Sequence, residues 1–139
     1  MKSFEILDHT ADIGIVARGR DLKELFANAA RGMFSVMTDL DRVNGGFDLE
    51  VSVEGNDYED LLVTWLNELL YVYEVKSAIL GNFLITDLGR HSLKALVRGE
   101  PIDLRKHTIN REIKACTYYE ARVGKNAEGF WEAQVYFDL

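Results

Sequence analysis

Cysteine, proline and long apolar runs are all scarce in this sequence, and each scarcity excludes a class of protein. The one cysteine, Cys116, cannot form an intramolecular disulfide. With one proline and 47% hydrophobic residues, the composition is that of a compact globule and not of a disordered tail. The most apolar segment, residues 61–75, carries polar side chains and is shorter than the ~20 residues that cross a bilayer. No N-terminal stretch resembles a secretory signal, so we expect a cytoplasmic protein without a membrane-spanning segment.

Basic residues are outnumbered as well. Sixteen Lys and Arg against 23 Asp and Glu give a formal net charge of -7 at pH 7. A surface with this charge repels phosphate backbones and anionic lipid, so we expect neither strong direct nucleic-acid binding nor membrane binding. It would attract a divalent cation or a basic protein, although acidity also serves solubility.

The length and the order of the expected elements favour one domain, residues 1–139, of the α+β class. Apolar residues recur at helical spacing from Leu22 to Met37 and from Leu61 to Tyr73. Asp21 with Glu24 resembles a capping box for the first helix, and Asn56 or Asp57 caps the second.

Alternating apolar residues predict the strands. Helices and strands do not alternate regularly, so we expect two main helices packed on a mixed or antiparallel sheet. The predicted strands are residues 2–7, 13–18, 47–53, 79–88 with a break near Gly81 and Asn82, 93–97, 113–123 and 130–138, the last two forming a hairpin.

Several catalytic signatures are missing. The sequence has no Gly-x-Ser-x-Gly motif, and Gly45-Gly46 lacks the spaced glycines and lysine of a phosphate-binding loop. We interpret Cys116 as a small core or surface hydrophobe. Three scattered histidines do not have zinc-ligand spacing. A bound metal would therefore be a hard cation held by oxygen.

Oxygen donors gather near both ends of the sequence. Asp8 and Asp12 flank a change of direction, and Asp138 precedes Leu139. If the last strand pairs beside the first two, Asp12 and Asp138 would converge with the carboxylate of Leu139. The alternative is that Asp8 and Asp12 cap turns and that Asp138 is a solvated residue, and spacing alone favours this alternative.

The remaining polar candidates have ordinary explanations too. His9 could be a ligand, a general base or a turn residue bonded to the backbone. One basic cluster stands out on the acidic chain, and it could contact a phosphate or an acidic partner, or simply form a solvated loop. It comprises Arg105, Lys106, His107, Arg111 and Lys114.

Taken together, six segments resemble the archease family over nearly the full length. The His-Thr-Ala-Asp motif, the Lys-Ala-x-Thr-Tyr motif and the aspartate near the end are specific only in combination. The segments are residues 4–12 (FEILDHTAD), 33–38 (MFSVMT), 61–73, 99–100 with His107, 113–118 (IKACTY) and 135–139 (VYFDL).

This resemblance implies a function in tRNA splicing. Archease-like proteins activate the GTP- and manganese-dependent RNA-splicing ligase, which joins ends bearing a 2′,3′-cyclic phosphate or 3′-phosphate to 5′-hydroxyl ends through a guanylylated histidine. They promote guanylylation and multiple turnover of the ligase without being the enzyme. They are also linked to a chaperone-like effect on a tRNA methyltransferase. The expected partners are therefore this ligase and that methyltransferase.

The resemblance also implies site residues. Family members bind calcium or another divalent ion through residues that match Asp12, Asp138 and Leu139. Lys114 matches a lysine tied to activation, and His9 and His107 fall on motif positions without an assigned role. Tyr119 departs from the family, because many members have a histidine there.

Two other functions stay open. A stand-alone metal-dependent phosphohydrolase could use the same carboxylates to activate water, and it would turn over a cyclic phosphate or nucleotide on its own. A chaperone-like module would need an exposed apolar patch, and it would suppress methyltransferase aggregation without stimulating the ligase.

Overall fold

A computed structural model describes residues 1–8 and 12–139 of the chain. Within these residues it has eight strands, two α-helices and one turn of 3₁₀ helix. In chain order they are β1 (Phe4–Asp8), β2 (Ile13–Gly19), α1 (Leu22–Met37), η1 (Leu40–Arg42), β3 (Phe47–Glu54), α2 (Tyr58–Lys76), β4 (Ala78–Leu88), β5 (Ser92–Pro101), β6 (Ala115–Cys116), β7 (Arg122–Lys125) and β8 (Trp131–Asp138).

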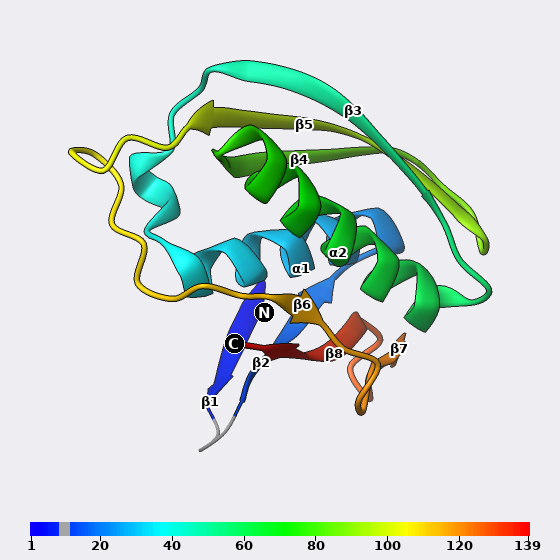
Figure 1. The fold of residues 1–139 in the computed structure, drawn as a ribbon. Helices are drawn as coiled ribbons and strands as arrows, with labels where there is room; N and C mark the ends of the chain where they lie inside the picture. The colour runs from blue at the N-terminus through cyan, green and yellow to red at the C-terminus, as the bar shows by residue number, and fades with distance from the viewer. Residues whose placement is uncertain (9–11) are drawn as a thin grey trace.

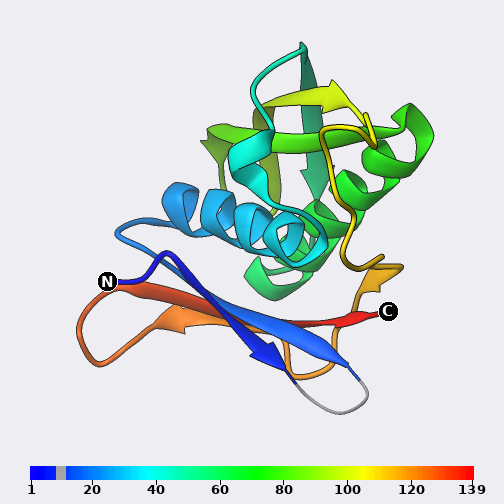
Figure 2. The same cartoon turned by 90° about the vertical axis from the view of Figure 1, so that its left-hand side faces the viewer.

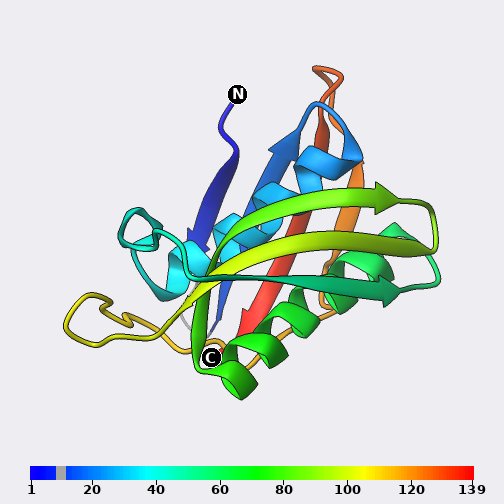
Figure 3. The same cartoon turned by 90° about the horizontal axis from the view of Figure 1, so that it is seen from above.

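The strands form two antiparallel sheets. The five-stranded sheet has the order β1-β2-β8-β6, with β7 also paired to β8, and the three-stranded sheet has the order β3-β5-β4. The two helices lie in the layer between the sheets (Figure 1, Figure 2). Seen from above, the strands of the three-stranded sheet run across those of the five-stranded sheet (Figure 3). The prediction of two main helices on antiparallel sheet is therefore confirmed.

Helix α1 begins and ends where the sequence predicts. The Asp21 carboxylate accepts a hydrogen bond from the Glu24 N–H at 2.8 Å. The Glu24 carboxylate in turn accepts a hydrogen bond from the Arg20 N–H. In a standard capping box it would accept from the N–H of the cap residue Asp21, so the second bond here is shifted by one residue. The apolar stripe is buried between the sheets. Its buried residues are Leu25, Phe26, Ala29, Ala30, Gly32, Met33, Phe34, Val36 and Met37.

Helix α2 settles the choice between two expected caps, because the Asp57 carboxylate accepts from the Asp60 N–H at 2.8 Å. The helix packs on the core through nine buried side chains, and the indole N–H of Trp65 donates to the Phe26 carbonyl of α1 at 3.0 Å. Burial of these side chains supplies most of the stabilisation, since each fully buried large apolar side chain contributes roughly 1.5–3 kcal/mol. No helix among residues 1–8 and 12–139 is long and apolar enough to cross a membrane.

The predicted strand at residues 113–123 is wrong as a single element. The chain forms the two-residue strand β6, turns at Tyr118–Ala121 and resumes as β7. Glu120 has a φ of 49°, a left-handed conformation outside the extended region that a regular strand requires. The hairpin with the last strand is therefore made by β7 and β8, and β6 pairs with the far end of β8.

The break predicted near Gly81 is a β-bulge. Strand β4 runs through it, and the register with β5 shifts between Leu80 and Asn82. A Cβ on Gly81 would lie 2.8 Å from a methyl carbon of Val43, so the glycine lets that side chain pack against the strand.

Candidate functional site

One end of the five-stranded sheet brings together segments that are far apart in sequence. Strands β2 and β8 pair with Ile13 opposite Phe137. Asp12 directly precedes β2 and Asp138 ends β8. Continued by one residue, this register would set Asp12 opposite Asp138, and directly opposed residues on antiparallel strands have Cβ atoms ~4.5–5.5 Å apart. Asp12 is half-buried and Asp138 is exposed. The strand pairing on which the predicted convergence depended is thus present in the fold.

The segment that leads into β6 adds a basic residue, Lys114, to the same end. The Lys114 N–H donates to the Asp138 carbonyl at 2.9 Å, and Ala115 lies opposite Asp138. The Lys114 side chain is exposed, and it forms no ion pair within the described part of the chain. One lysine therefore stands beside Asp138 and Leu139 at the edge of the sheet.

The donors at this end suit a hard divalent cation. Asp12 and Asp138 supply carboxylate oxygens, and Leu139 supplies backbone oxygen. Within residues 1–8 and 12–139, no group of three or more His, Cys, Asp or Glu side chains is close enough to hold a metal ion. Calcium takes six to eight oxygens, so these residues fit an open site completed by water or by a partner. His9, another sequence candidate, lies outside the described residues.

Two tyrosines border the carboxylates on the outer face of the sheet. Tyr136 pairs with Gly14, and a Cβ on Gly14 would lie 2.7 Å from the Tyr136 ring, so only a glycine lets the ring lie across β2. The Tyr119 ring packs 5.7 Å from that of Tyr136 and is 62% exposed. Tyr119 therefore lies against Tyr136 on the outer face of the sheet, near the end of β8.

His107 is buried and not part of a solvated loop. Its ring Nδ1 accepts from the Asp103 N–H at 3.0 Å, so the proton is on Nε2, which donates to the Glu100 carboxylate at 2.7 Å. Lys106 pairs with the same carboxylate at 2.9 Å. Burial opposes ionisation of Glu100, but the hydrogen bonds from Lys106 and His107 outweigh it and lower its pKa. His107 holds its loop in place, and any contact with a partner would pass through that loop.

The basic cluster expected from the sequence is partly neutralised. Arg105 is exposed and pairs with Asp103 at 3.4 Å, and Lys106 pairs with Glu100. Lys114 is separated from them in the chain by a segment that packs on the end of α1, where the Asn110 N–H donates to the Met37 carbonyl at 2.7 Å. The cluster therefore does not act as one positive patch.

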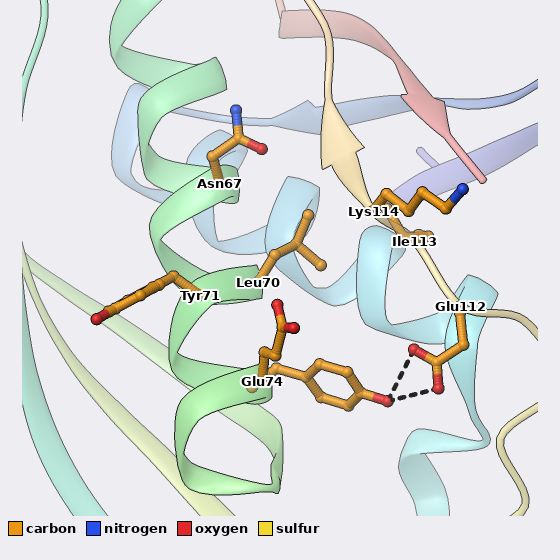
Figure 4. Close-up of a pocket in the computed structure, with 8 residues that line it drawn as sticks. Asn67, Leu70, Tyr71, Glu74, Glu112, Ile113 and Lys114 are labelled. Atoms are coloured by element: carbon orange, nitrogen blue, oxygen red, sulfur yellow. Dashed lines mark hydrogen bonds between the residues drawn. The ribbon is translucent and has the colours of Figure 1, made fainter.

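A polar pocket of about 400 Å³ lies between α2 and the segment that leads into β6 (Figure 4). The Tyr73 hydroxyl donates to the two Glu112 carboxylate oxygens at 3.2 and 3.3 Å. Burial, with the nearby Glu112 carboxylate, raises the pKa of Tyr73 to about 12. Lys114 belongs both to this pocket and to the sheet end. The lining residues are Asn67, Leu70, Tyr71, Tyr73, Glu74, Glu112, Ile113 and Lys114.

Two residues at the pocket, Cys116 and Asn67, connect β6 with α2. Cys116 is buried, as expected for a small hydrophobe, and burial raises the pKa of its thiol to about 12, which suppresses the nucleophilic thiolate. Asn67 interrupts an apolar helix, and the sequence offers no sign of a role for it. In the structure its side-chain amide accepts a hydrogen bond from the Cys116 N–H and donates one to the Cys116 carbonyl.

Comparison with known proteins gives consistent matches. Residues 4–139 match the Archease protein family (MTH1598/TM1083). The chain is 42% identical to Protein archease of Methanosarcina acetivorans over 142 residues, covering 99% of this chain and 97% of the relative. It is 33% identical to Protein archease of Pyrococcus furiosus, with 100% of both chains covered.

Two solved structures have the same fold. The solution structure of Methanobacterium thermoautotrophicum protein 1598 superposes with a TM-score of 0.82 at 34% identity, over 100% of both chains. The crystal structure of an archease from Thermotoga maritima, described as a possible chaperone, gives a TM-score of 0.67 at 22% identity, over 96% of this chain and 94% of that one.

Proposed function

This chain belongs to the archease family, and we propose that it is a non-catalytic, cytoplasmic activator of the RNA-splicing ligase of tRNA maturation. It would promote guanylylation of the ligase and its multiple turnover. The observation that supports the proposal is the pairing of β8 with both β2 and β6, which ends these strands at one edge of the five-stranded sheet, where the segments that carry Asp12, Asp138, Leu139 and Lys114 begin or end. These residues come from segments that carry the family resemblance.

The carboxylates of this end are proposed to bind a divalent cation, with Ca²⁺ expected. Asp12 and Asp138 would hold it with their side chains, and Leu139 would contribute backbone oxygen. When bound, the ion would supply positive charge that offsets the two carboxylates. The protein's own contribution would be geometric, because the pairing of β2 with β8 would keep these donors close together before any partner arrives.

Lys114 is proposed to face the ligase. Its ammonium is exposed beside Asp138, so it can donate to an anionic group of the partner, such as a phosphate at the nucleotide site. A charge-assisted hydrogen bond of this kind contributes roughly 1.5–3 kcal/mol when it is desolvated. Because β6 is bonded to β8, Lys114 and the carboxylates would dock together.

The test is ligase guanylylation with GTP and Mn²⁺, measured with and without this protein. We expect stimulation by the wild type, and loss of most of it in Asp12→Asn and Asp138→Asn. Asp87→Asn is the matched control, since it removes the same charge from an exposed position on β4 of the other sheet. Wild-type stimulation by both site variants would contradict the proposal. Turnover of a cyclic phosphate by the purified protein alone would favour the phosphohydrolase.

A chaperone-like role toward a tRNA methyltransferase is a second candidate, and an exposed apolar pair favours it. Leu84 on β4 and Leu96 on β5 lie opposite each other on the outer face of the three-stranded sheet, and they are 59% and 37% exposed. Exposed apolar surface can hold an unfolded partner. Suppression of methyltransferase aggregation that is lost in Leu84→Ser with Leu96→Ser would support this role.

A further inference from the structure

Strand β6 is too short to hold itself in place, yet Lys114 depends on it. It has two residues, and the preceding segment, residues 102–114, contains no helix or strand. On one side the strand is bonded to β8, through the Lys114 N–H to the Asp138 carbonyl and the Thr117 N–H to the Tyr136 carbonyl, both at 2.9 Å. On the other side it faces α2 (Figure 4).

The bond to α2 is made by one side chain. The Cys116 N–H donates to Asn67 Oδ1 at 2.8 Å, and Asn67 Nδ2 donates to the Cys116 carbonyl at 3.0 Å. A neighbouring strand would satisfy a backbone N–H and C=O in the same way. At this edge of the five-stranded sheet, Asn67 therefore makes the two hydrogen bonds to Cys116 that a further strand would make.

The anchor behind Asn67 is rigid. Asn67 lies on α2 between Leu66 and Leu70, and both leucines are buried in the core. The amide is partly buried, so water competes poorly for its bonds to Cys116. The position of the strand is consequently tied to that of α2 and hence to the core.

We propose that Asn67 is a positioning residue, which fixes β6 so that Lys114 stands beside Asp138 and Leu139. Its functional meaning rests on the role proposed for Lys114 above. Two further bonds from α2 to the chain on either side of β6 are different in kind. Tyr73 donates to Glu112 at 3.2 and 3.3 Å, and Asp60 accepts from the Tyr118 hydroxyl at 2.6 Å. Both join side chains only and leave the backbone of β6 untouched, so they do not set the place of the strand.

The first experiment measures amide hydrogen exchange and does not involve the ligase. Asn67→Leu removes both bonds to Cys116, and Asn67→Asp keeps the acceptor but sets an oxygen against the Cys116 carbonyl. We expect exchange of the Lys114 and Thr117 amides to rise about tenfold or more in both variants, because opening of β6 exposes them. Tyr73→Phe is the matched control, with a change of less than about twofold. Unchanged exchange in the folded Asn67 variants would overturn the inference.

The second experiment separates positioning from stability. Ligase guanylylation is measured for Asn67→Asp, Lys114→Ala and the double variant at a temperature where all are folded. We expect each single variant to lose about fivefold or more of the stimulation, and Asn67→Asp to add nothing in the Lys114→Ala background, since groups that act as one unit are not additive. Additive losses, or full stimulation by Asn67→Asp, would contradict the positioning role.

The two experiments fail independently. If the wild type does not stimulate the ligase, the proposed function is wrong, while the exchange result still decides whether Asn67 fixes β6. If the wild type stimulates and the Asn67 variants neither loosen β6 nor lose stimulation, only the inference about Asn67 is wrong.

Discussion

The two sheets are assembled in different ways. The three-stranded sheet comes from one continuous stretch, residues 47–101, and β4 and β5 follow each other as a hairpin. The five-stranded sheet joins the two ends of the chain, because β2 pairs with β8. The residues that we propose to bind the cation and the ligase, Asp12, Asp138, Leu139 and Lys114, all lie at the ends of the paired strands β2, β8 and β6 or next to them. The comparison teaches that the distant pairing, and not the local hairpin, creates the cluster.

The largest effect is expected where the long-range pairing meets the core. Phe137 lies on β8 opposite Ile13 and is fully buried. Phe137→Ala should lower the free energy of unfolding by about 3–5 kcal/mol, because it removes a large apolar side chain and leaves a cavity. Urea unfolding followed by circular dichroism measures this. A loss below about 1 kcal/mol would mean that the pairing is not anchored by this ring.

A second variant disturbs the pairing of β2 with β8 at Gly14, which lies opposite Tyr136 on the outer face of the sheet. Gly14→Ala would place a Cβ 2.7 Å from the Tyr136 ring and 2.7 Å from the Val135 carbonyl oxygen. We expect a loss of about 2–3 kcal/mol, since the backbone of β8 must shift. In Gly124→Ala, the control on β7, the new Cβ meets nothing within 4 Å. Equal unfolding midpoints for the two variants would contradict the close packing at Gly14.

A third variant acts on the loop that follows β5. The lowered pKa of Glu100 means that its carboxylate stabilises the fold above the ordinary glutamate pKa of about 4.3, and that this contribution is lost as the pH falls through the lower folded value. Glu100→Gln should cost about 1.5 kcal/mol at pH 7 through weaker bonds to Lys106 and His107.

The measurement for Glu100→Gln is urea unfolding of variant and wild type between pH 7 and pH 3. The difference between them should shrink as the pH falls below about 4. A constant difference across this range would show that the charge of Glu100 does not contribute to stability.

The smallest effect is expected on the outer face of the three-stranded sheet. Leu84 is 59% exposed, so Leu84→Ser should change the free energy of unfolding by less than about 0.5 kcal/mol. It should also leave ligase stimulation at the wild-type level. Loss of stimulation in this variant would place the ligase contact on the three-stranded sheet and reverse the comparison.

Local signals predicted much of the fold. Helix α1 follows from the Asp21 cap and a stripe of apolar residues at helical spacing, and the structure gives it the same first and last residues. The alternation from Phe47 to Val53 likewise predicted β3, which in the structure ends one residue later at Glu54. These elements were predictable because propensity, capping and apolar spacing within a few turns all favour the same structure.

The sequence failed where a residue's partner lies far along the chain. Residues 113–123 alternate well enough to predict one strand, but pairing of β6 with β8 and the left-handed Glu120 divide it. The sequence allowed a solvated loop around His107, because the hydrogen bonds of its ring to Glu100 and from Asp103 form only when the loop folds back. Asn67 gave no sign of its role because it is a polar residue within an apolar helical segment, and its partner Cys116 lies on β6.

By itself, the sequence determined the α+β class, the two helices and the membership of the archease family, because caps, periodicity and motifs are local properties. Only the tertiary structure decided that Ile13 lies opposite Phe137, which ends the segments of Asp12 and Asp138 at the same edge of the sheet, and that Asn67 bonds β6. The physical reason is that strand register is set by burying one face of each strand across long loops. The register therefore depends on the packing of the whole core, and no single segment of the sequence determines it.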